Sequence, residues 1–295
     1  MDKNNFLNQL ETELEKIMGK EVGIRVQKVR KNNGVIYTGL VLQNLDVNIA
    51  PTIYVDDFYE KYQEGEGIHT LAEQIVQVYE KGKPKDSVDM DFFVDFKKVK
   101  DRIAFRLVHK EKNKELLEDI PYIDFLDLAI CFYYAFYNEE LGDGMILIHN
   151  SHMEMWKTNK EELLSLAKKN TEKLFPPVLM SMEAIMQECF EVSFGELQMY
   201  VLTNKQRCQG AASILFPKML EEIARKIGGD FWILPSSVHE VIAIKAKEQE
   251  DVEMLHQMIA EVNGTQLSVE EVLAEYPYYY DSQKKELRQT ARVTN

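Results

Sequence analysis

The stretch FWILPSSVHEVIAIKA, residues 231–246, places two serines, a histidine and a glutamate inside an otherwise apolar segment. In an extended strand, Ser237 and His239 lie on the same face, two residues apart. A serine nucleophile needs a base that takes its proton, so this pair is the candidate catalytic pair of a hydrolase. Glu240 lies on the opposite face of a regular strand and is poorly placed to orient the imidazole. Pro-Ser-Ser is also ordinary turn chemistry, and we favour a turn between two strands.

A second candidate is an anion-binding site at Lys205, Arg207 and Gly210, in the segment NKQRCQGAAS. This segment lies between a predicted strand and a predicted helix start, where free backbone amides attract anions. It contains a single glycine and matches no phosphate-loop pattern, so a loop with two solvated basic residues is the alternative. Cys208 lies in the same segment. An ordinary exposed cysteine is the favoured interpretation, and the alternative is a thiol whose pKa is lowered by a helix N-terminus and two nearby cations.

His149, His152 and Glu154 form a His-x-x-His-x-Glu string. The zinc-protease pattern His-Glu-x-x-His, which supplies a base between its two ligands, is not present. Glu154 faces away from His152 on a helix, so the string lacks the third ligand of a catalytic zinc site. We therefore expect no metal site and, without a nucleotide-binding loop, no cofactor.

The composition narrows the class of protein. The chain has 295 residues, 45% of them hydrophobic, and a formal net charge of -14. Packed cores are therefore expected, and a nucleic-acid partner is disfavoured because phosphate backbones need a positive surface. No apolar run reaches the ~18 residues of a membrane-spanning helix. The three cysteines form no close pair, and the first residues show no apolar signal region, so a cytoplasmic location is expected.

Local patterns predict the elements that would position these residues. Apolar residues from Phe6 to Met18 recur at helical spacing, and Asn33-Gly34 supplies the positive φ of a tight hairpin. Thr158 and Ser268 each begin a capping-box pattern. Helices are predicted at 51–65, 69–82, 91–101, 158–170, 210–229, 251–264 and 269–275. Strands are predicted at 102–109, 125–137, 144–150, 199–204, 230–235 and 238–246, with an edge strand at 277–281. The run from Leu126 to Tyr137 is nearly all apolar, so it is expected to be a strand covered on both faces or else a buried helix.

This order of elements predicts an α+β fold, with mixed or antiparallel sheets and helices packed on one face. A β-α-β-β-α-β unit is expected at the C-terminus. We divide the chain into an N-terminal region of a helix, a hairpin and further helices (1–85), a central α+β region (86–195), a C-terminal α+β unit (196–283) and a flexible tail (284–295).

Several segments together resemble a bacterial family of unknown function that is common in gut anaerobes. They include NIAPTIYVDDFYEKYQEG, RLVHKEKNKELLEDIPYIDFLDLAI, ILIHNSHMEMW, MYVLTN and ILPSSVHEVI. The resemblance covers nearly the whole chain. A weaker one, to a second unknown-function family of bacilli, rests on LIHNSHMEMWKTNKEELLSLAKKNTEKL and on residues 210–244. Neither resemblance implies a catalytic residue.

These observations leave the biochemical function unknown. The favoured hypothesis is a non-catalytic binding or regulatory module with a protein partner, and without a nucleic-acid or membrane partner. The alternative is a hydrolase that uses Ser237, or its neighbour Ser236, with His239. A third hypothesis is an anion or nucleotide binder at Lys205, Arg207 and Gly210.

Overall fold

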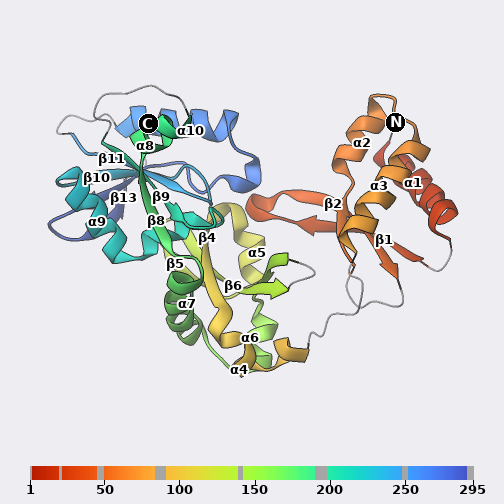
Figure 1. Cartoon of the computed structure of the whole chain (residues 1–295), viewed down its shortest axis with the longest axis horizontal. Helices are drawn as coiled ribbons and strands as arrows, with labels where there is room; N and C mark the ends of the chain where they lie inside the picture. The colour runs from red at the N-terminus through yellow and green to blue at the C-terminus, as the bar shows by residue number, and fades with distance from the viewer. Residues whose placement is uncertain are drawn as a thin grey trace. The chain divides into compact units, whose positions relative to one another are not determined.

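The computed structural model of the whole chain describes residues 2–19, 22–44, 50–83, 91–138, 142–189, 198–247 and 252–290. The chain divides into two compact units (Figure 1). The first unit comprises residues 1–31, 35–93 and 137–144, and the second comprises residues 32–34, 94–136 and 145–295. Both combine helices with antiparallel sheets, as the sequence predicts for an α+β fold.

The first unit packs helices against a three-stranded antiparallel sheet of order β1-β2-β3. Its elements are α1 (Lys3–Met18), β1 (Val22–Arg30), β2 (Ile36–Asn44), β3 (Thr52–Tyr54), α2 (Asp56–Gln63) and α3 (Ile68–Gly82). The predicted stripe of α1 is buried at Phe6, Leu10 and Leu14. It shares a core with Leu40 of β2 and Ile75 of α3.

Two local expectations in this unit have different outcomes. Asn33 and Gly34 have φ values of 58° and 73°, so the predicted left-handed turn between β1 and β2 is confirmed. Residues 51–65 do not form one helix, because β3 precedes α2. Asp56, the first residue of α2, accepts the backbone N–H of Thr38 at 2.8 Å and pairs with Lys3 at 2.7 Å. These contacts hold the start of α2 against β2 and α1.

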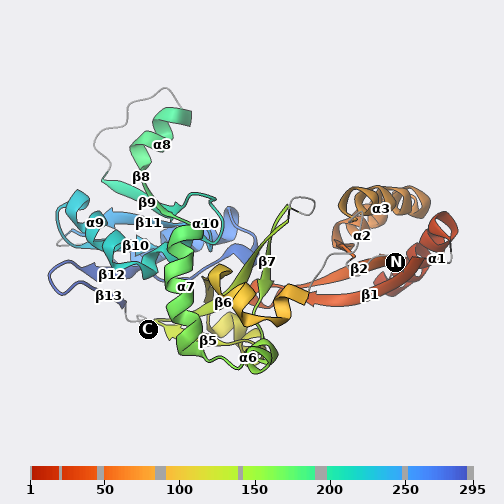
Figure 2. The same cartoon turned by 60° about the horizontal axis from the view of Figure 1, so that its bottom comes forward.

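The second unit contains a four-stranded antiparallel sheet. It comprises β4 (Ile103–His109), β5 (Tyr122–Phe125), β6 (Leu128–Asn138) and β7 (Gly142–Leu147), with β6 between β4 and β5. Every residue from Leu128 to Ala135 is buried, so β6 is the predicted strand that is covered on both faces. Helix α7 (Lys160–Leu174) lies along this sheet in both views (Figures 1 and 2).

The same unit contains a six-stranded antiparallel sheet of order β13-β12-β10-β11-β9-β8. Its strands are β8 (Pro177–Ser181), β9 (Met199–Asn204), β10 (Phe231–Leu234), β11 (Val241–Lys245), β12 (Tyr278–Asp281) and β13 (Glu286–Gln289). The expected edge strand at 277–281 is therefore interior, because β13 pairs with it. The stretch from residue 284, which we expected to be a tail, contains this added strand.

Different helices pack on the two faces of the six-stranded sheet. Helix α10 (Val252–Thr265) packs Leu255 and Ile259 against Trp232 and Leu234 of β10. Side chains alternate along a strand, so Phe231 and Ile233 point to the other face. Helix α9 (Pro217–Ile227) lies on that other side of the sheet (Figure 1). The helices thus occupy both faces of this sheet.

Short elements complete the second unit. They are α4 (Phe96–Val99), α5 (Lys114–Asp119), α6 (Asn150–Trp156) and α8 (Met182–Cys189), with 3-10 turns η3 (Lys100–Arg102), η4 (Glu111–Asn113), η5 (Gly210–Leu215) and η6 (Val269–Glu271). The turn η2 (Asp91–Val94) begins in the first unit and ends in the second. The helix predicted at 91–101 is therefore a series of short turns. The helix predicted at 210–229 divides into η5 and α9, because Pro217 occupies the first position of α9.

The two predicted capping boxes also differ from expectation. The N-cap of α7 is Asn159 and not Thr158: the Asn159 side chain accepts the backbone N–H of Glu162 at 2.9 Å, and the Thr158 hydroxyl bonds to the Glu162 side chain at 2.6 Å. Ser268 and Glu271 do form a capping box. It caps only the three residues of η6, so the expected helix at 269–275 is a single 3-10 turn.

Candidate functional site

Ser237 and His239 lie in the connection between β10 and β11, and the bonds of Ser237 are those of a turn. The Ser237 hydroxyl oxygen accepts the backbone N–H of His239 at 3.0 Å, and the Ser237 N–H donates to the Glu240 carbonyl at 3.1 Å. Ser237 is only 5% exposed. Its oxygen thus bonds to the His239 backbone and not to the His239 ring.

The His239 ring is bound from elsewhere in the chain. Its Nδ1 accepts the backbone N–H of Gln209 at 3.3 Å, so the proton of the neutral ring lies on Nε2. Nε2 faces the Glu271 carboxylate, with 3.8 Å between Nε2 and Oε1. The His239 carbonyl accepts the Thr203 hydroxyl at 2.7 Å. Catalysis by Ser237 and His239 stays a prediction, and this bonding pattern does not support it.

The three residues of the proposed anion site lie in different surroundings. Gly210 is buried, and a Cβ at this position would lie 2.5 Å from the His239 carbonyl oxygen and 2.7 Å from the Asn204 nitrogen. No space for a ligand remains there. Lys205 and Arg207 are exposed, and the Arg207 side chain contacts the Met180 sulfur at 3.9 Å. The structure does not bring these three residues together around a cavity, and an anion at this loop stays a prediction.

Cys208 does not have the lowered pKa that the sequence offered as an alternative to an ordinary cysteine. Asn204 holds its backbone through two bonds, one to the Cys208 N–H at 3.2 Å and one to its carbonyl at 2.7 Å. Burial raises the pKa of the Cys208 thiol, and the nearby Arg106 charge opposes this effect only in part. The alternative of a lowered pKa is therefore wrong, because desolvation outweighs the cation.

His149 and His152 form a helix cap. The His152 ring nitrogen Nδ1 accepts the backbone N–H of His149 at 3.1 Å, and the His149 side chain accepts the backbone N–H of His152 in return. The ring of His152 also packs against Trp156. Burial, and then the neighbouring His149, lower the pKa of His152. Among the residues that the structure describes, no group of three His, Cys, Asp or Glu side chains could hold a metal ion.

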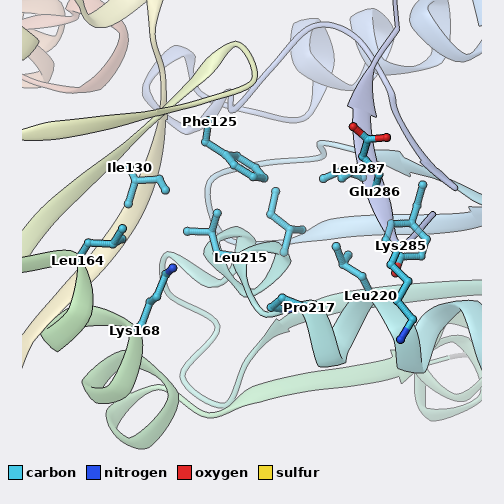
Figure 3. Close-up of a pocket in the computed structure, with 12 residues that line it drawn as sticks. Phe125, Ile130, Leu164, Lys168, Leu215, Pro217, Leu220, Lys285, Glu286 and Leu287 are labelled. Atoms are coloured by element: carbon cyan, nitrogen blue, oxygen red, sulfur yellow. The ribbon is translucent and has the colours of Figure 1, made fainter. Parts of the chain in front are cut away.

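A pocket of about 340 Å³ opens in the second unit, between the two sheets (Figure 3). Its walls include Phe125 of β5, Ile130 of β6, Leu164 of α7, Leu215 of η5, Leu220 of α9 and Tyr280 of β12. This volume lies at the lower end of the range of about 300–1,000 Å³ that is typical of small-molecule sites. With Leu287 of β13, side chains from seven elements in four separate parts of the sequence thus form one mainly apolar cavity.

Charged groups lie at the rim of this pocket. Lys168 of α7 is exposed and has no ion pair or hydrogen bond with any residue that the structure describes. Lys285 is paired with Glu221 at 3.1 Å. The Glu286 carboxylate and the Lys285 amine point in opposite directions (Figure 3). Lys168 is therefore available to a ligand with a negative charge.

One carboxylate fixes the wall formed by β12 and β13. Asp230, just before β10, accepts the Tyr279 hydroxyl at 2.6 Å, and the Ser282 hydroxyl and N–H at 2.6 and 2.8 Å. These bonds, led by that of the Ser282 hydroxyl, lower the pKa of Asp230. The bond to Asp230 raises the pKa of Tyr279 to about 12. The hairpin that carries Tyr280 and Lys285 is thus tied to the start of β10.

The sequence analysis missed both the pocket and the position of Glu271. Most of the pocket residues are ordinary apolar residues of seven different elements, and the sequence shows only that each lies on the buried face of its strand or helix. Glu271 was identified as a capping residue, which it is, but no pattern relates it to His239, 32 positions earlier in the chain. None of the helices that the structure describes combines the length and apolarity of a membrane span.

Comparison with known proteins gives one match. The model of a family of unknown function, DUF5688, matches residues 3–282. No curated protein matches the chain, and no solved structure matches it. The distribution among gut anaerobes and the likeness to a second family stay predictions. The whole-chain resemblance is confirmed: the chain belongs to the DUF5688 family.

Proposed function

We propose that this member of the DUF5688 family is a non-catalytic binding protein whose pocket between β5, β6, α7, α9 and β12 takes a small amphipathic molecule with a negatively charged end. The observation that carries this proposal is the 340 Å³ apolar pocket with an unpaired lysine at its rim. Apolar walls favour burial of a hydrocarbon or aromatic body, at about 25 cal/mol for each Å² removed from water. Lys168 would attract the charged end.

Octanoate is a suitable probe because it combines a short apolar chain with one carboxylate. Octanoate is expected to raise the thermal unfolding temperature, since a ligand that binds only the folded state stabilises it. Leu215→Trp would fill the pocket and is expected to abolish this shift. Octanoate that stabilises the Leu215→Trp protein as strongly as the wild type would contradict the proposal.

The role of the Lys168 charge can be tested against a matched substitution at Lys169, the next residue of α7. Lys168→Gln is expected to weaken octanoate binding about two- to fivefold, the effect of one exposed ion pair. Lys169→Gln removes the same charge from an exposed residue that does not line the pocket, and should leave binding unchanged. 1-Octanol, which has no charge, should bind all three proteins equally. Equal octanoate affinities in the two variants would remove Lys168 from the proposal.

A protein partner is a second candidate, favoured by the exposed apolar face of α10. Met254, Met258 and Val262 are 51%, 45% and 36% exposed there. Methionine-rich faces adapt to apolar helices, and the net charge of -14 favours a basic one. A synthetic amphipathic Leu/Lys peptide is expected to bind with an affinity that Met258→Glu lowers more than Gln257→Glu, which adds the same charge nearby. Equal effects of the two substitutions would reject this face.

We also propose a cytoplasmic location, supported by two free thiols, Cys131 and Cys208, among the described side chains. Free thiols are typical of reducing compartments. Fractionation of cells that express the natural sequence tests this proposal, and recovery of the protein in a membrane or secreted fraction would contradict it.

A further inference from the structure

Arg106 lies in the interior of β4 with no partner. Its Nε atom is buried and lacks a hydrogen bond, and the side chain makes no ion pair or hydrogen bond with any residue that the structure describes. Its neighbours Phe105 and Leu107 are buried apolar residues. The residue as a whole is half-buried, so the unsatisfied group is the Nε–H, and a buried N–H without an acceptor is unfavourable. An arginine in this condition is typical of a site whose anion comes from outside the chain.

The register of the sheet identifies the residues that share the face of Arg106. Directly opposite residues of paired antiparallel strands point to the same face. Arg106 is opposite Cys131 of β6, and Ala104 is opposite Tyr133, so Tyr133 is a diagonal neighbour of Arg106. At one end of this face, Tyr133 packs against Phe175. Arg106 thus lies between apolar side chains on a largely dry surface.

Tyr133 offers a second free donor. It is only 3% exposed, and its hydroxyl has no hydrogen bond to the part of the chain that the structure describes. Buried tyrosine hydroxyls normally find a partner. Two neighbouring side chains on one face therefore both have unused N–H or O–H donors, and none of the described residues provides an acceptor for them.

The loop between β9 and η5 brings Cys208 to the same place. Its Gln206 side chain donates to the Leu174 carbonyl at 2.9 Å, and the Lys205 N–H donates to the Pro176 carbonyl at 2.9 Å. The loop is thereby fixed next to Phe175, which covers Tyr133. Burial raises the pKa of Tyr133 and Cys208 adds to this effect, whereas the charge of Arg106 opposes the effect of burial on the Cys208 thiol. The thiol is therefore near both donors.

We propose that Arg106 and Tyr133 form a binding site for the carboxylate of a small organic acid, with Cys208 beside it. A guanidinium offers two parallel N–H donors that match a carboxylate, and the phenol O–H can donate to one of its oxygens. One cation balances one monoanion. A phosphate dianion would retain an uncompensated charge in a largely apolar place, so the carboxylate is the better match.

This site is independent of the pocket proposed above. Ile130 lines the pocket, whereas its chain neighbour Cys131 is opposite Arg106. Successive side chains of a strand point to opposite faces, so the two sites lie on opposite faces of the same sheet. Each site can be tested without the other.

Acetate and inorganic phosphate are the probes for a thermal unfolding experiment, with sodium chloride at the same ionic strength as the reference. Acetate is expected to raise the unfolding temperature of the wild type by about 2–4 °C. Arg106→Gln should abolish this shift and should unfold in chloride at the same temperature as the wild type or higher, because it removes a buried Nε–H that has no acceptor among the described residues. Arg225→Gln, which removes an exposed charge on α9, should keep the shift.

Two results would overturn the proposal. One is an acetate shift that persists in the Arg106→Gln protein. The other is a larger shift with phosphate than with acetate that depends on Arg106, which would reject the carboxylate. Tyr133→Phe provides a second variant that keeps the apolar packing, and it is expected to lower the acetate affinity about tenfold. Unchanged affinity would remove Tyr133 from the site.

If the Arg106→Gln protein does not fold, acetate binding can still be tested with Arg106 and Tyr133 both in place. In protein carrying Cys189→Ser, iodoacetamide is expected to alkylate Cys208, because Cys131 is fully buried and burial raises its pKa to about 12. Acetate should slow this alkylation, since it neutralises the guanidinium that favours the thiolate. An alkylation rate that acetate leaves unchanged would contradict binding next to Cys208.

Discussion

The imidazole of His239 faces the carboxylate of Glu271, with 3.8 Å between Nε2 and Oε1. Glu271 in turn accepts the hydroxyl and the N–H of Ser268 at 2.8 and 3.1 Å. The N–H of Val238 also donates to the Glu271 carbonyl at 2.8 Å. The pair thus joins the β10–β11 connection to the turn before β12, and its geometry is that of a structural contact between two loops.

Acid is expected to weaken this contact. The Ser268 hydroxyl, then the Ser268 N–H, lower the pKa of Glu271 below 4.5. A carboxyl with a lowered folded-state pKa stabilises the fold above its unfolded pKa and loses this effect as the pH falls through the folded pKa. Glu271→Ala should therefore cost about 1 kcal/mol at pH 6 and less at pH 3, as measured by urea unfolding. Glu270→Ala, at the half-buried neighbouring position whose carboxylate makes no hydrogen bond with the described residues, should cost less at pH 6 than Glu271→Ala.

Ser237→Ala tests the hydrolase hypothesis together with the turn. Loss of the buried hydroxyl leaves the His239 N–H without its acceptor, which is expected to lower the free energy of unfolding by about 1–3 kcal/mol. Ser236→Ala, at the adjacent position where no side-chain hydrogen bond is formed, should change it by less than about 0.5 kcal/mol. A fluorophosphonate probe should not label Ser237. Labelling that His239→Gln abolishes would support the hydrolase instead.

The reciprocal cap of α6 predicts a pH dependence near neutrality. The pKa of His152 is lowered from 6.5 in the folded protein, so its contribution to stability is complete above pH 6.5 and is lost as the pH falls through the lower folded value. Gln at this third helical position can accept the same N–H without titrating. His152→Gln should therefore lose less stability than the wild type between pH 7.5 and 5.5. Equal losses in urea unfolding would contradict the cap.

Gly210→Ala should be among the most damaging substitutions of one small residue for another. The added Cβ would meet two backbone atoms, from His239 and Asn204, which cannot rotate away. We expect a loss of about 3 kcal/mol or more in the free energy of unfolding. Gly264→Ala in α10 meets no atom within 4 Å and should be neutral or stabilising by up to about 1 kcal/mol. Similar effects of the two changes would contradict this packing.

Periodicity and turn chemistry predicted much of the fold. Asn33-Gly34, the stripe of α1 and the apolar run of β6 each specify their structure through local sequence, and the structure agrees. The errors occur where tertiary contacts or one residue override a pattern. Pro217 divides the predicted helix at 210–229. Pairing with β13 makes the expected edge strand an interior strand, and no local sequence pattern predicts this pairing.

The candidate sites were less predictable because their residues converge from distant elements. Ser237 and His239 are close in sequence, but the ring is bound by Gln209 and faces Glu271. Arg106 had a local signal: a single charged residue inside an apolar strand. Strand alternation alone could place it on a face, but only the register with Tyr133 shows that it lies between apolar clusters.

The carboxylate of Asp230 keeps the β12–β13 wall of the pocket in place over a wide pH range. Its own pKa lies below its usual value, and that of its partner Tyr279 is raised to about 12. Neither end of this bond titrates in the physiological range. The bonds that hold the β12–β13 hairpin to the start of β10 should therefore not change with pH in this range. Entry and release of a ligand along this wall of the pocket should be independent of pH.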